Sequence, residues 1–347
     1  MKKQVISIIT GFIMACSAVA APLGQSESSW KAMVVDSVVD NGANARTKRV
    51  ISKLKDGEKV YVACLGGSIT EGAGPADFHD GYVYQFQKKL AQKYAKDPSQ
   101  VVLADAGLSG SPSPLGLLRY QQDVVNVLGH KPDVLVIEFS VNDWQEPTNG
   151  RAFEALNRRG LEDNPDCTVI ALYATANYAN QQDWMIPIAS HYQIPQVSIR
   201  NVMDKRWASG EVNKDDYLSD YAHPKTDGHT FMADCLMNVF ETAEKAAEKS
   251  AQIPAEPKLA NPLNKFCMIT GSDGKVTVEK GSFDSKDKFT QAIKKTGQGD
   301  FPMNWHHKFG SKTNDPLKVT VKCKAFMLIF KENSASPSTP YGLAQVI

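Results

Sequence analysis

The chain has 347 residues, of which 42% are hydrophobic and 22% are charged, and its formal net charge is +1. This length allows one large domain or two ordinary ones, and the composition is that of a soluble globular protein. A nearly neutral chain without a block of basic residues gives no reason to expect a nucleic-acid partner. Beyond the N-terminal segment, no apolar stretch approaches the ~20 residues that cross a bilayer, so no membrane span is expected.

The first 20 residues have the pattern of a secretory signal peptide. Lys2 and Lys3 precede an apolar stretch at residues 5–15, and small residues before position 21 offer a cleavage site. Residues 1–20 are therefore predicted to direct the protein out of the cytoplasm, to a secreted or periplasmic location. Cys16 leaves an alternative open, because it could instead be the lipidated cysteine of a lipoprotein.

After a polar lead-in at residues 21–42, patterns of helical and strand type alternate along the chain. Helices are predicted at residues 43–55, 82–94, 115–128, 151–161, 184–192 and 226–248. Strands are predicted at residues 60–65, 101–104, 134–139, 168–173 and 197–202. Strands that alternate with helices form βαβ units. Residues 43–249 are therefore predicted to form a three-layer α/β/α sandwich around a mainly parallel, flavodoxin-like sheet of about five strands.

The pattern changes after this domain. Residues 250–264 contain three prolines and predict a linker. Residues 265–347 are predicted to be a small all-β accessory domain, because short alternating apolar runs occur at 275–278, 317–323 and 325–330. The last residues, 341–347, have the pattern of a strand with nothing after it to pair with. The accessory domain is therefore expected to be incomplete.

The cysteines do not define the fold. Those beyond the signal peptide are scattered and odd in number, so no disulfide framework is indicated: Cys64, Cys167, Cys235, Cys267 and Cys323. Cys267 and Cys323 could pair in an oxidising compartment, but the sequence does not establish that disulfide.

Three loops after successive predicted strands each offer a group that an acyl-transfer site needs. The first strand ends in two glycines and then Ser68, a candidate nucleophile. The second loop holds Gly110, whose bare backbone N–H can point at a ligand, and the third holds Asn142, a side-chain amide donor. Ligands bind at the carboxyl ends of the strands in open α/β sheets. The N–H groups of Ser68 and Gly110 and the amide of Asn142 are therefore predicted to form an oxyanion hole.

A base for Ser68 is offered by His223, which lies just before the last predicted helix. Asp220 is three residues earlier, so its carboxylate can reach the imidazole and fix the tautomer that leaves the other nitrogen facing Ser68. His229 is expected to pack inside the helix rather than act as a second base. Each of these signals alone also has a structural explanation, such as a turn, a cap or a surface ion pair. Their coincidence at strand ends favours a Ser-His-Asp site.

These stretches carry a resemblance to a known family. In order and spacing, four of them resemble the four sequence blocks of the SGNH (GDSL-like) hydrolases, namely residues 66–72, 107–110, 141–143 and 220–224. The resemblance covers about residues 43–249. It implies an esterase that needs no metal or organic cofactor. The roles it implies are Ser68 as nucleophile, His223 as base, Asp220 as its orienting acid, and Ser68, Gly110 and Asn142 as oxyanion donors.

Three positions depart from the usual pattern of that family. The first block reads Gly-Gly-Ser-Ile instead of Gly-Asp-Ser-Leu, Ser140 stands where many members have glycine, and Asp105 replaces a frequent asparagine. None of these changes removes a predicted catalytic group, so they bear on substrate and subfamily. The Gly-Gly-Ser-Ile-Thr form, the signal peptide and the β-rich domain resemble bacterial carbohydrate esterases that deacetylate plant polysaccharides. The expected substrate is therefore an acylated carbohydrate or a small ester.

Two other functions stay open at this point. His223, Asp227 and His229, together with Asp220, offer metal-ligand types that would suit a metal-dependent hydrolase. A non-catalytic glycan-binding protein would instead use the accessory domain, where aromatic and polar residues gather at Trp305, His306, His307 and Phe309. The sequence indicates neither the acyl group, the alcohol nor the oligomeric state.

Overall fold

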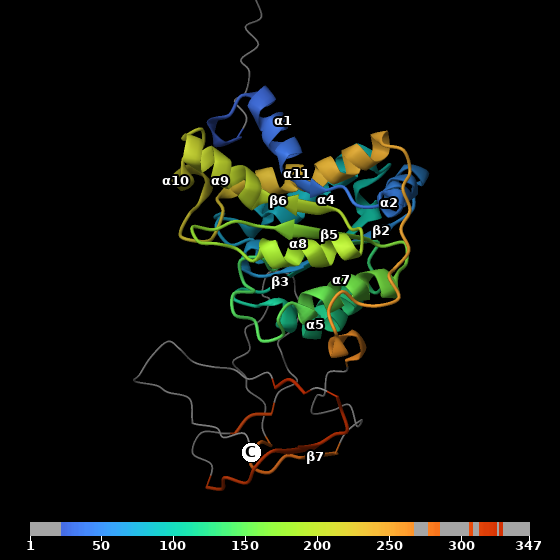
Figure 1. The fold of residues 1–347 in the computed structure, drawn as a ribbon, viewed down its shortest axis with the longest axis vertical. Coiled ribbons are helices and arrows are strands. Elements are labelled where there is room, and N and C mark those ends of the chain that lie inside the picture. The colour runs from blue at the N-terminus through green and yellow to red at the C-terminus, as the bar shows by residue number, and fades with distance from the viewer. Residues whose placement is uncertain (1–21, 267–276, 285–304, 308–311, 325, 329–347) are drawn as a thin grey trace, which may run out of the picture.

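The computed structural model of the protein describes residues 22–266, 277–284, 305–307, 312–324 and 326–328 (Figure 1). The predicted signal peptide at residues 1–20, with Cys16, lies outside these ranges, as do Cys267, Phe309 and the terminal run at 341–347. Cys323 is described, and its thiol is exposed.

The described residues contain a six-stranded sheet in the spatial order β1-β6-β5-β4-β2-β3. All neighbouring strands from β2 to β6 are parallel, and β1 pairs antiparallel with β6 at one edge. The strands are β1 (Val38–Asp40), β2 (Val60–Gly66), β3 (Val101–Gly107), β4 (Val134–Glu138), β5 (Thr168–Tyr173) and β6 (Gln196–Ser198). Counted along the chain, the five parallel strands have the flavodoxin-like order 2-1-3-4-5. The predicted flavodoxin-like sandwich is confirmed, and β1 is a sixth strand that was not predicted.

Helices cover both faces of the sheet, which is why the parallel strands are nearly continuous apolar runs. One layer contains α2 (Ala45–Asp56), α4 (Tyr82–Tyr94), α9 (Ile199–Ser209) and α11 (Thr226–Lys245). The other contains α5 (Ser113–Arg119), a π-helical turn (Tyr120–Val125), α6 (Asn126–Leu128), α7 (Arg151–Asp163) and α8 (Gln182–His191). In Figure 1 the sheet lies between α4 and α11 on one side and α5 and α7 on the other. Both α4 and β5 have the predicted bounds.

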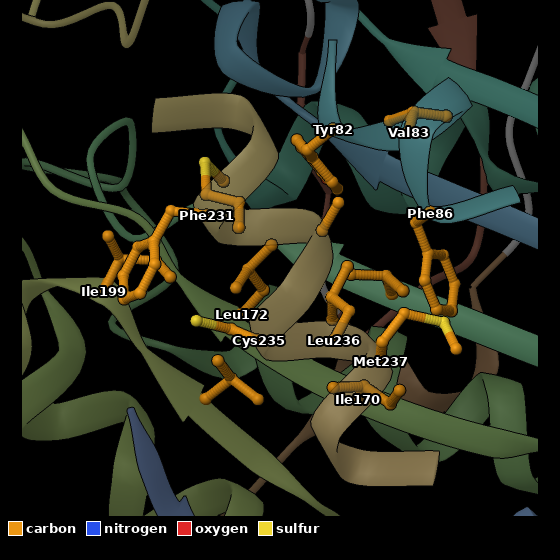
Figure 2. Packing of buried hydrophobic residues seen from close by; sticks show 14 of the residues in the cluster. Tyr82, Val83, Phe86, Ile170, Leu172, Ile199, Phe231, Cys235, Leu236 and Met237 are labelled. Atoms are coloured by element: carbon orange, nitrogen blue, oxygen red, sulfur yellow. The ribbon is translucent and has the colours of Figure 1, made fainter. Parts of the chain in front are cut away.

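The longest helix, α11, is the centre of the first core layer. Its residues Phe231, Cys235 and Leu236 are completely buried and face the sheet residues Ile170 and Leu172 (Figure 2). Burying a side chain of this size contributes about 1.5–3 kcal/mol relative to leaving it exposed. This packing holds the start of α11, and therefore the loop before it, at a fixed place on the sheet.

The segment at residues 21–42, which was predicted only as a polar lead-in, contains α1 (Glu27–Asp36) and β1. Trp30 of α1 packs edge-on against Phe231 of α11, with ring centroids 5.3 Å apart, and its indole N–H donates to Asp234 at 2.9 Å. The residues that hold this polar segment in place therefore lie about 200 positions further along the chain. The composition of the segment itself does not reveal these contacts.

The strand predicted at residues 197–202 is also partly wrong, because β6 ends at Ser198 and α9 begins at Ile199. The Ser198 hydroxyl caps this helix by accepting a hydrogen bond from Asn201 N at 3.0 Å. Ile199 and Val202, which resemble strand residues, are buried three positions apart on one helical face. The cap, and not β propensity, decides the local structure.

Residues 250–264, which were predicted to be a linker, lie along α7. Arg158 donates to the carbonyl oxygen of Pro254 at 3.0 Å, and the buried carboxylate of Glu154 accepts from Leu259 N at 3.0 Å. Further along, β7 (Thr277–Glu279) and β8 (Lys318–Thr320) form a small antiparallel pair. Among the described residues, no helix is both long and apolar enough to cross a membrane.

Candidate active site

The parallel strand order places a ligand site between β2 and β4. In a sheet of order 2-1-3-4-5 the direction of winding changes between the first and third strands, and ligands bind beyond the carboxyl ends at that switch point. Ser68 follows β2 and Asn142 follows β4, so the two loops flank the switch point. Ser68 is the first residue of α3 (Ser68–Glu71), a single turn that ends at Gly72.

Gly67 brings the amide of Asn142 against the turn that carries Ser68. A Cβ at Gly67 would fall 2.2 Å from Asn142 Oδ1, so a larger residue would push this side chain away. Asn142 Oδ1 is buried and has no hydrogen-bond partner among the described residues. The glycine before Ser68 therefore permits close contact between the nucleophile turn and the predicted oxyanion donor.

His223 is held between Ser68 and Asp220. Its Nε2 lies 2.8 Å from Ser68 Oγ, and its Nδ1 lies 2.7 Å from Asp220 Oδ2. Asp220 Oδ1 also accepts from the backbone N–H groups of Ala222 at 2.7 Å and His223 at 2.8 Å. One carboxylate thus shapes the turn and orients the ring. With the proton on Nδ1, the geometry leaves Nε2 able to accept the proton of Ser68.

The charge of Asp220 is favoured by these contacts. Partial burial acts to raise its pKa, but hydrogen bonds from the His223 ring and from the backbone N–H groups of Ala222 and His223 outweigh burial and leave the pKa below its usual value. Asp220 therefore carries a negative charge at neutral pH.

The Gly110 loop is attached to the nucleophile turn through Glu71. The Glu71 carboxylate accepts from the backbone N–H of Ser109 at 2.8 Å and from the Ser109 hydroxyl. Gly110 itself is exposed and has φ +71°, a left-handed conformation that favours glycine. The buried Arg119 donates to the carbonyl oxygen of Ala106, near the end of β3, at 3.1 Å. The loops after β2 and β3 are thereby fixed relative to each other.

Two buried carboxyl groups brace the same loops. Glu138, at the end of β4, accepts from Thr70 Oγ1 at 3.0 Å and from the backbone N–H of Gly67. Asp143 accepts from Ser113 N, at the start of α5, at 2.6 Å. Burial is the main cause that raises the pKa of Glu138 to about 7 and that of Asp143 to about 7. Both groups are therefore partly protonated near neutral pH.

The raised pKa of Glu138 predicts a pH-dependent stability. Between the ordinary pKa of a glutamate, 4.5, and the raised pKa of about 7, the folded protein keeps a proton that the unfolded chain releases. The free energy of unfolding therefore falls as pH rises through this window. Glutamine does not titrate, so Glu138→Gln removes this fall in the free energy of unfolding. The quantity to compare is the free energy of unfolding of the variant minus that of the wild type. We expect this difference to be roughly 2–3 kcal/mol larger at pH 8 than at pH 5, because one pKa unit corresponds to about 1.4 kcal/mol.

Urea unfolding at several pH values measures this difference. The exposed Glu248 offers a matched control, since Glu248→Gln should leave the pH dependence unchanged. A difference between Glu138→Gln and wild type that stays constant from pH 5 to pH 8 would contradict the assignment.

The residues offered for the metal-dependent alternative have other partners in the structure. His229 is buried, with Nδ1 accepting from Tyr82 N at 3.1 Å and Nε2 facing the carbonyl oxygen of Ala73 at 3.1 Å. Asp227 accepts from Leu23 N at 3.0 Å, while both nitrogens of His223 face Ser68 and Asp220. Within the described ranges, no group of three or more His, Cys, Asp or Glu side chains converges to hold an ion. The packing role expected for His229 is confirmed.

The structure thus brings together Ser68, His223 and Asp220, and it places Asn142 beside the nucleophile turn. The sequence patterns do not single out the residues that hold the loops, namely Glu71, Glu138 and Asp143. A signal for them existed in part, since acidic residues at the ends of apolar strands are unusual. In the accessory region, Trp305 is half-buried and His307 Nε2 faces the carbonyl oxygen of Thr313 at 3.0 Å.

Comparison with known families agrees with this geometry. Residues 64–231 match the sequence model of the GDSL-like lipase/acylhydrolase family, and this segment holds Ser68, Gly110, Asn142, Asp220 and His223. The protein has an α/β fold like that of the SGNH hydrolases, and the match to this family model supports ester hydrolysis as the chemistry of the site.

Two solved structures resemble this protein over most of its length. One is a two-domain esterase active on acetylated mannans, with a TM-score of 0.65 and 24% identity over 76% of this chain and 70% of that chain. The other is a two-domain esterase active on acetylated mannans co-crystallised with mannopentaose, with a TM-score of 0.66 and 25% identity over 76% of this chain and 69% of that chain. The first shows the shared fold alone.

Proposed function

We propose that the protein is a secreted serine esterase that removes acyl groups, most simply acetyl groups, from plant polysaccharides. The observation that carries this proposal is the hydrogen-bonded series Ser68–His223–Asp220, with distances of 2.8 and 2.7 Å. A serine hydroxyl is a weak nucleophile until a positioned base takes its proton, and this series supplies the base and its orienting group.

In the proposed mechanism, Ser68 Oγ attacks the acyl carbon while its proton passes to His223 Nε2. The carbonyl oxygen becomes an oxyanion that accepts hydrogen bonds from the N–H groups of Ser68 and Gly110 and from the Asn142 amide. The C–O bond to the alcohol then breaks, and the alcohol leaves with the proton from His223. Water attacks the acyl-enzyme by the same steps in reverse and releases the acid and free Ser68.

The substrate class is supported by the likeness to esterases active on acetylated mannans, at 25% identity for the structure with mannopentaose. The leader pattern at residues 1–20 supports export to the compartment where plant polysaccharides are found. We also propose that residues 43–249 form the hydrolase domain, with 250–264 as the connection to a β-rich accessory domain at 265–347. The described pair of β7 and β8 supports the β-rich part.

Acetate release from acetylated mannan, xylan and pectin, compared with short and long p-nitrophenyl esters, tests the proposed function. We expect release from an acetylated polysaccharide, with preference for the short acyl chain. We further expect an alkyl fluorophosphonate to inactivate the protein and to add its mass to the peptide that carries Ser68. Activity that resists the phosphonate but disappears with a strong chelator would contradict a serine mechanism, and binding of polysaccharide without ester cleavage would contradict an enzyme.

A further inference from the structure

Two exposed tyrosines lie together beside His223. Tyr178 is 43% exposed and Tyr221 is 67% exposed, and their ring centroids are 6.2 Å apart. The Tyr221 ring centroid lies 6.4 Å from that of His223. Exposed aromatic side chains that cluster next to a site mark ligand-binding surfaces more often than isolated exposed aromatic side chains do.

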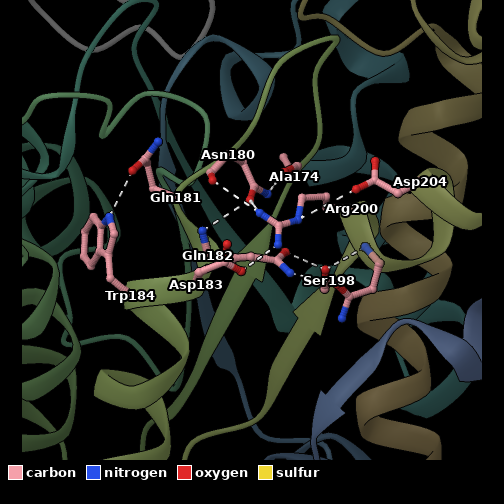
Figure 3. A network of polar contacts seen from close by, with 10 residues as sticks. Ala174, Asn180, Gln181, Gln182, Asp183, Trp184, Ser198, Arg200 and Asp204 are labelled. Carbon is pink, nitrogen blue, oxygen red and sulfur yellow. Dashed lines mark hydrogen bonds and ion pairs between the residues drawn. The ribbon is translucent and has the colours of Figure 1, made fainter.

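Arg200 contacts the segment between β5 and α8, which carries Tyr178, through Asn180 and Asp183 (Figure 3). The guanidinium donates to Asn180 Oδ1 at 2.9 Å and to the Asn180 carbonyl oxygen at 3.3 Å. It also donates to Asp183 at 2.6 Å, and Asn180 in turn donates to the carbonyl oxygen of Ala174 at 2.6 Å. Because these hydrogen bonds already fix the loop, little conformational entropy of the Tyr178 backbone is left to lose when a ligand binds.

The same loop connects the two halves of the proposed site. Its Asn177 N donates to the carbonyl oxygen of Tyr221 at 2.8 Å, next to the base. At its other end Gln181 N donates to the carbonyl oxygen of Ser140 at 2.7 Å, two residues before the predicted oxyanion donor Asn142. The position of Tyr178 is thereby set relative to both.

The chemistry determines which part of the substrate faces the tyrosines. His223 gives its proton to the departing alcohol, so the alcohol oxygen must lie within hydrogen-bond reach of Nε2. The carbonyl oxygen must instead face Asn142 and Gly110. Groups on the His223 side, where Tyr221 and Tyr178 lie, therefore contact the alcohol part of the ester.

We propose that Tyr178 and Tyr221 form the binding subsite for the alcohol part of the ester, and that this alcohol is a sugar ring. A pyranose has apolar C–H faces and a rim of hydroxyl groups, and tyrosine offers an apolar ring face and a polar hydroxyl. This inference rests on the proposed function and specifies its substrate side.

Steady-state kinetics with two esters of the same acyl group test the subsite. An acetylated manno-oligosaccharide places a sugar on the tyrosines, whereas ethyl acetate does not reach them. For Tyr221→Ala we expect kcat/KM on the oligosaccharide to fall about 10-fold, mainly through KM, since loss of one buried aromatic contact commonly costs more than 1 kcal/mol. With ethyl acetate, kcat/KM should stay within about 2-fold. Tyr178→Ala combined with Tyr221→Ala should lower only the oligosaccharide value further.

Tyr221→Phe keeps the ring and should retain most of the oligosaccharide activity. Trp144 is the matched control, because it is also a large aromatic residue, is 66% exposed and stands two residues after Asn142 in the loop that follows β4. Loss of oligosaccharide activity in Trp144→Ala with the tyrosine variants unaffected would overturn the proposal, as would an equal fall on both esters. A wild-type protein that cleaves neither ester would instead refute the esterase itself.

Discussion

Replacing Ser68 by alanine is expected to lower kcat for acetate release by about 10⁴-fold or more, because the nucleophile and its proton relay act as a unit. Ser68 Oγ lies 2.8 Å from His223 Nε2, and a methyl group at this position can neither attack a carbonyl nor exchange a proton. KM should change little, since binding of the substrate does not depend on the hydroxyl. Acetate release by purified Ser68→Ala under saturating substrate measures the effect.

The control for this substitution is Ser52→Ala. Ser52 is an exposed residue of α2, and its hydroxyl donates to Asp56 at 3.2 Å. The kcat of Ser52→Ala should equal that of the wild type. Because the groups work together, His223→Ala and the double variant with Ser68→Ala should be as slow as Ser68→Ala alone. Near-full turnover by Ser68→Ala would remove Ser68 from the mechanism.

Replacing Asn142 by alanine is expected to lower kcat by roughly 10²–10³-fold, which is the usual effect of removing one oxyanion-hole donor. The amide lies against Gly67, next to the nucleophile, so its loss acts on the transition state and leaves Ser68 and His223 in place. The free energy of unfolding should change little, because Asn142 Oδ1 has no hydrogen-bond partner to lose.

Labelling by a fluorophosphonate separates these two roles. Asn142→Ala retains the activated serine and should still react with the reagent, though more slowly, whereas Ser68→Ala should not react at all. The exposed Asn126→Ala serves as the control and should behave as the wild type. If Asn142→Ala kept wild-type kcat, the oxyanion donors would have to be sought elsewhere on the rim.

Much of this site could be predicted because its groups stand at the ends of elements that local patterns reveal. Ser68 and Asn142 each follow an apolar strand, and Asp220 needs only two intervening residues to reach His223. Gly110 follows β3, as expected, and its role as an oxyanion donor stays a prediction. Local patterns did not reveal the hydrogen bonds that hold these loops in place. The partners of Glu71 and Glu138 lie 38 and 68 residues away along the chain.

The same limit explains the errors in the fold. The segment at residues 21–42 looks polar, yet α1 is ordered because Trp30 meets α11. The metal alternative arose because His223 and His229 are neighbours in sequence. In the structure, one ring lies at the rim and the other is buried in α11 against Tyr82 N.

The amino-acid sequence by itself determined the alternation of buried strands and amphipathic helices, and with it the sheet rim where the polar groups gather, because hydrophobic periodicity and turn residues act over short stretches of chain. Only the tertiary structure decided the strand order and the added edge strand β1. It also decided which carboxyl groups are buried as braces and that Tyr178 lies beside Tyr221. The physical reason is that burial and hydrogen-bond partners depend on residues that folding brings together from distant parts of the chain. The local sequence pattern does not encode these contacts.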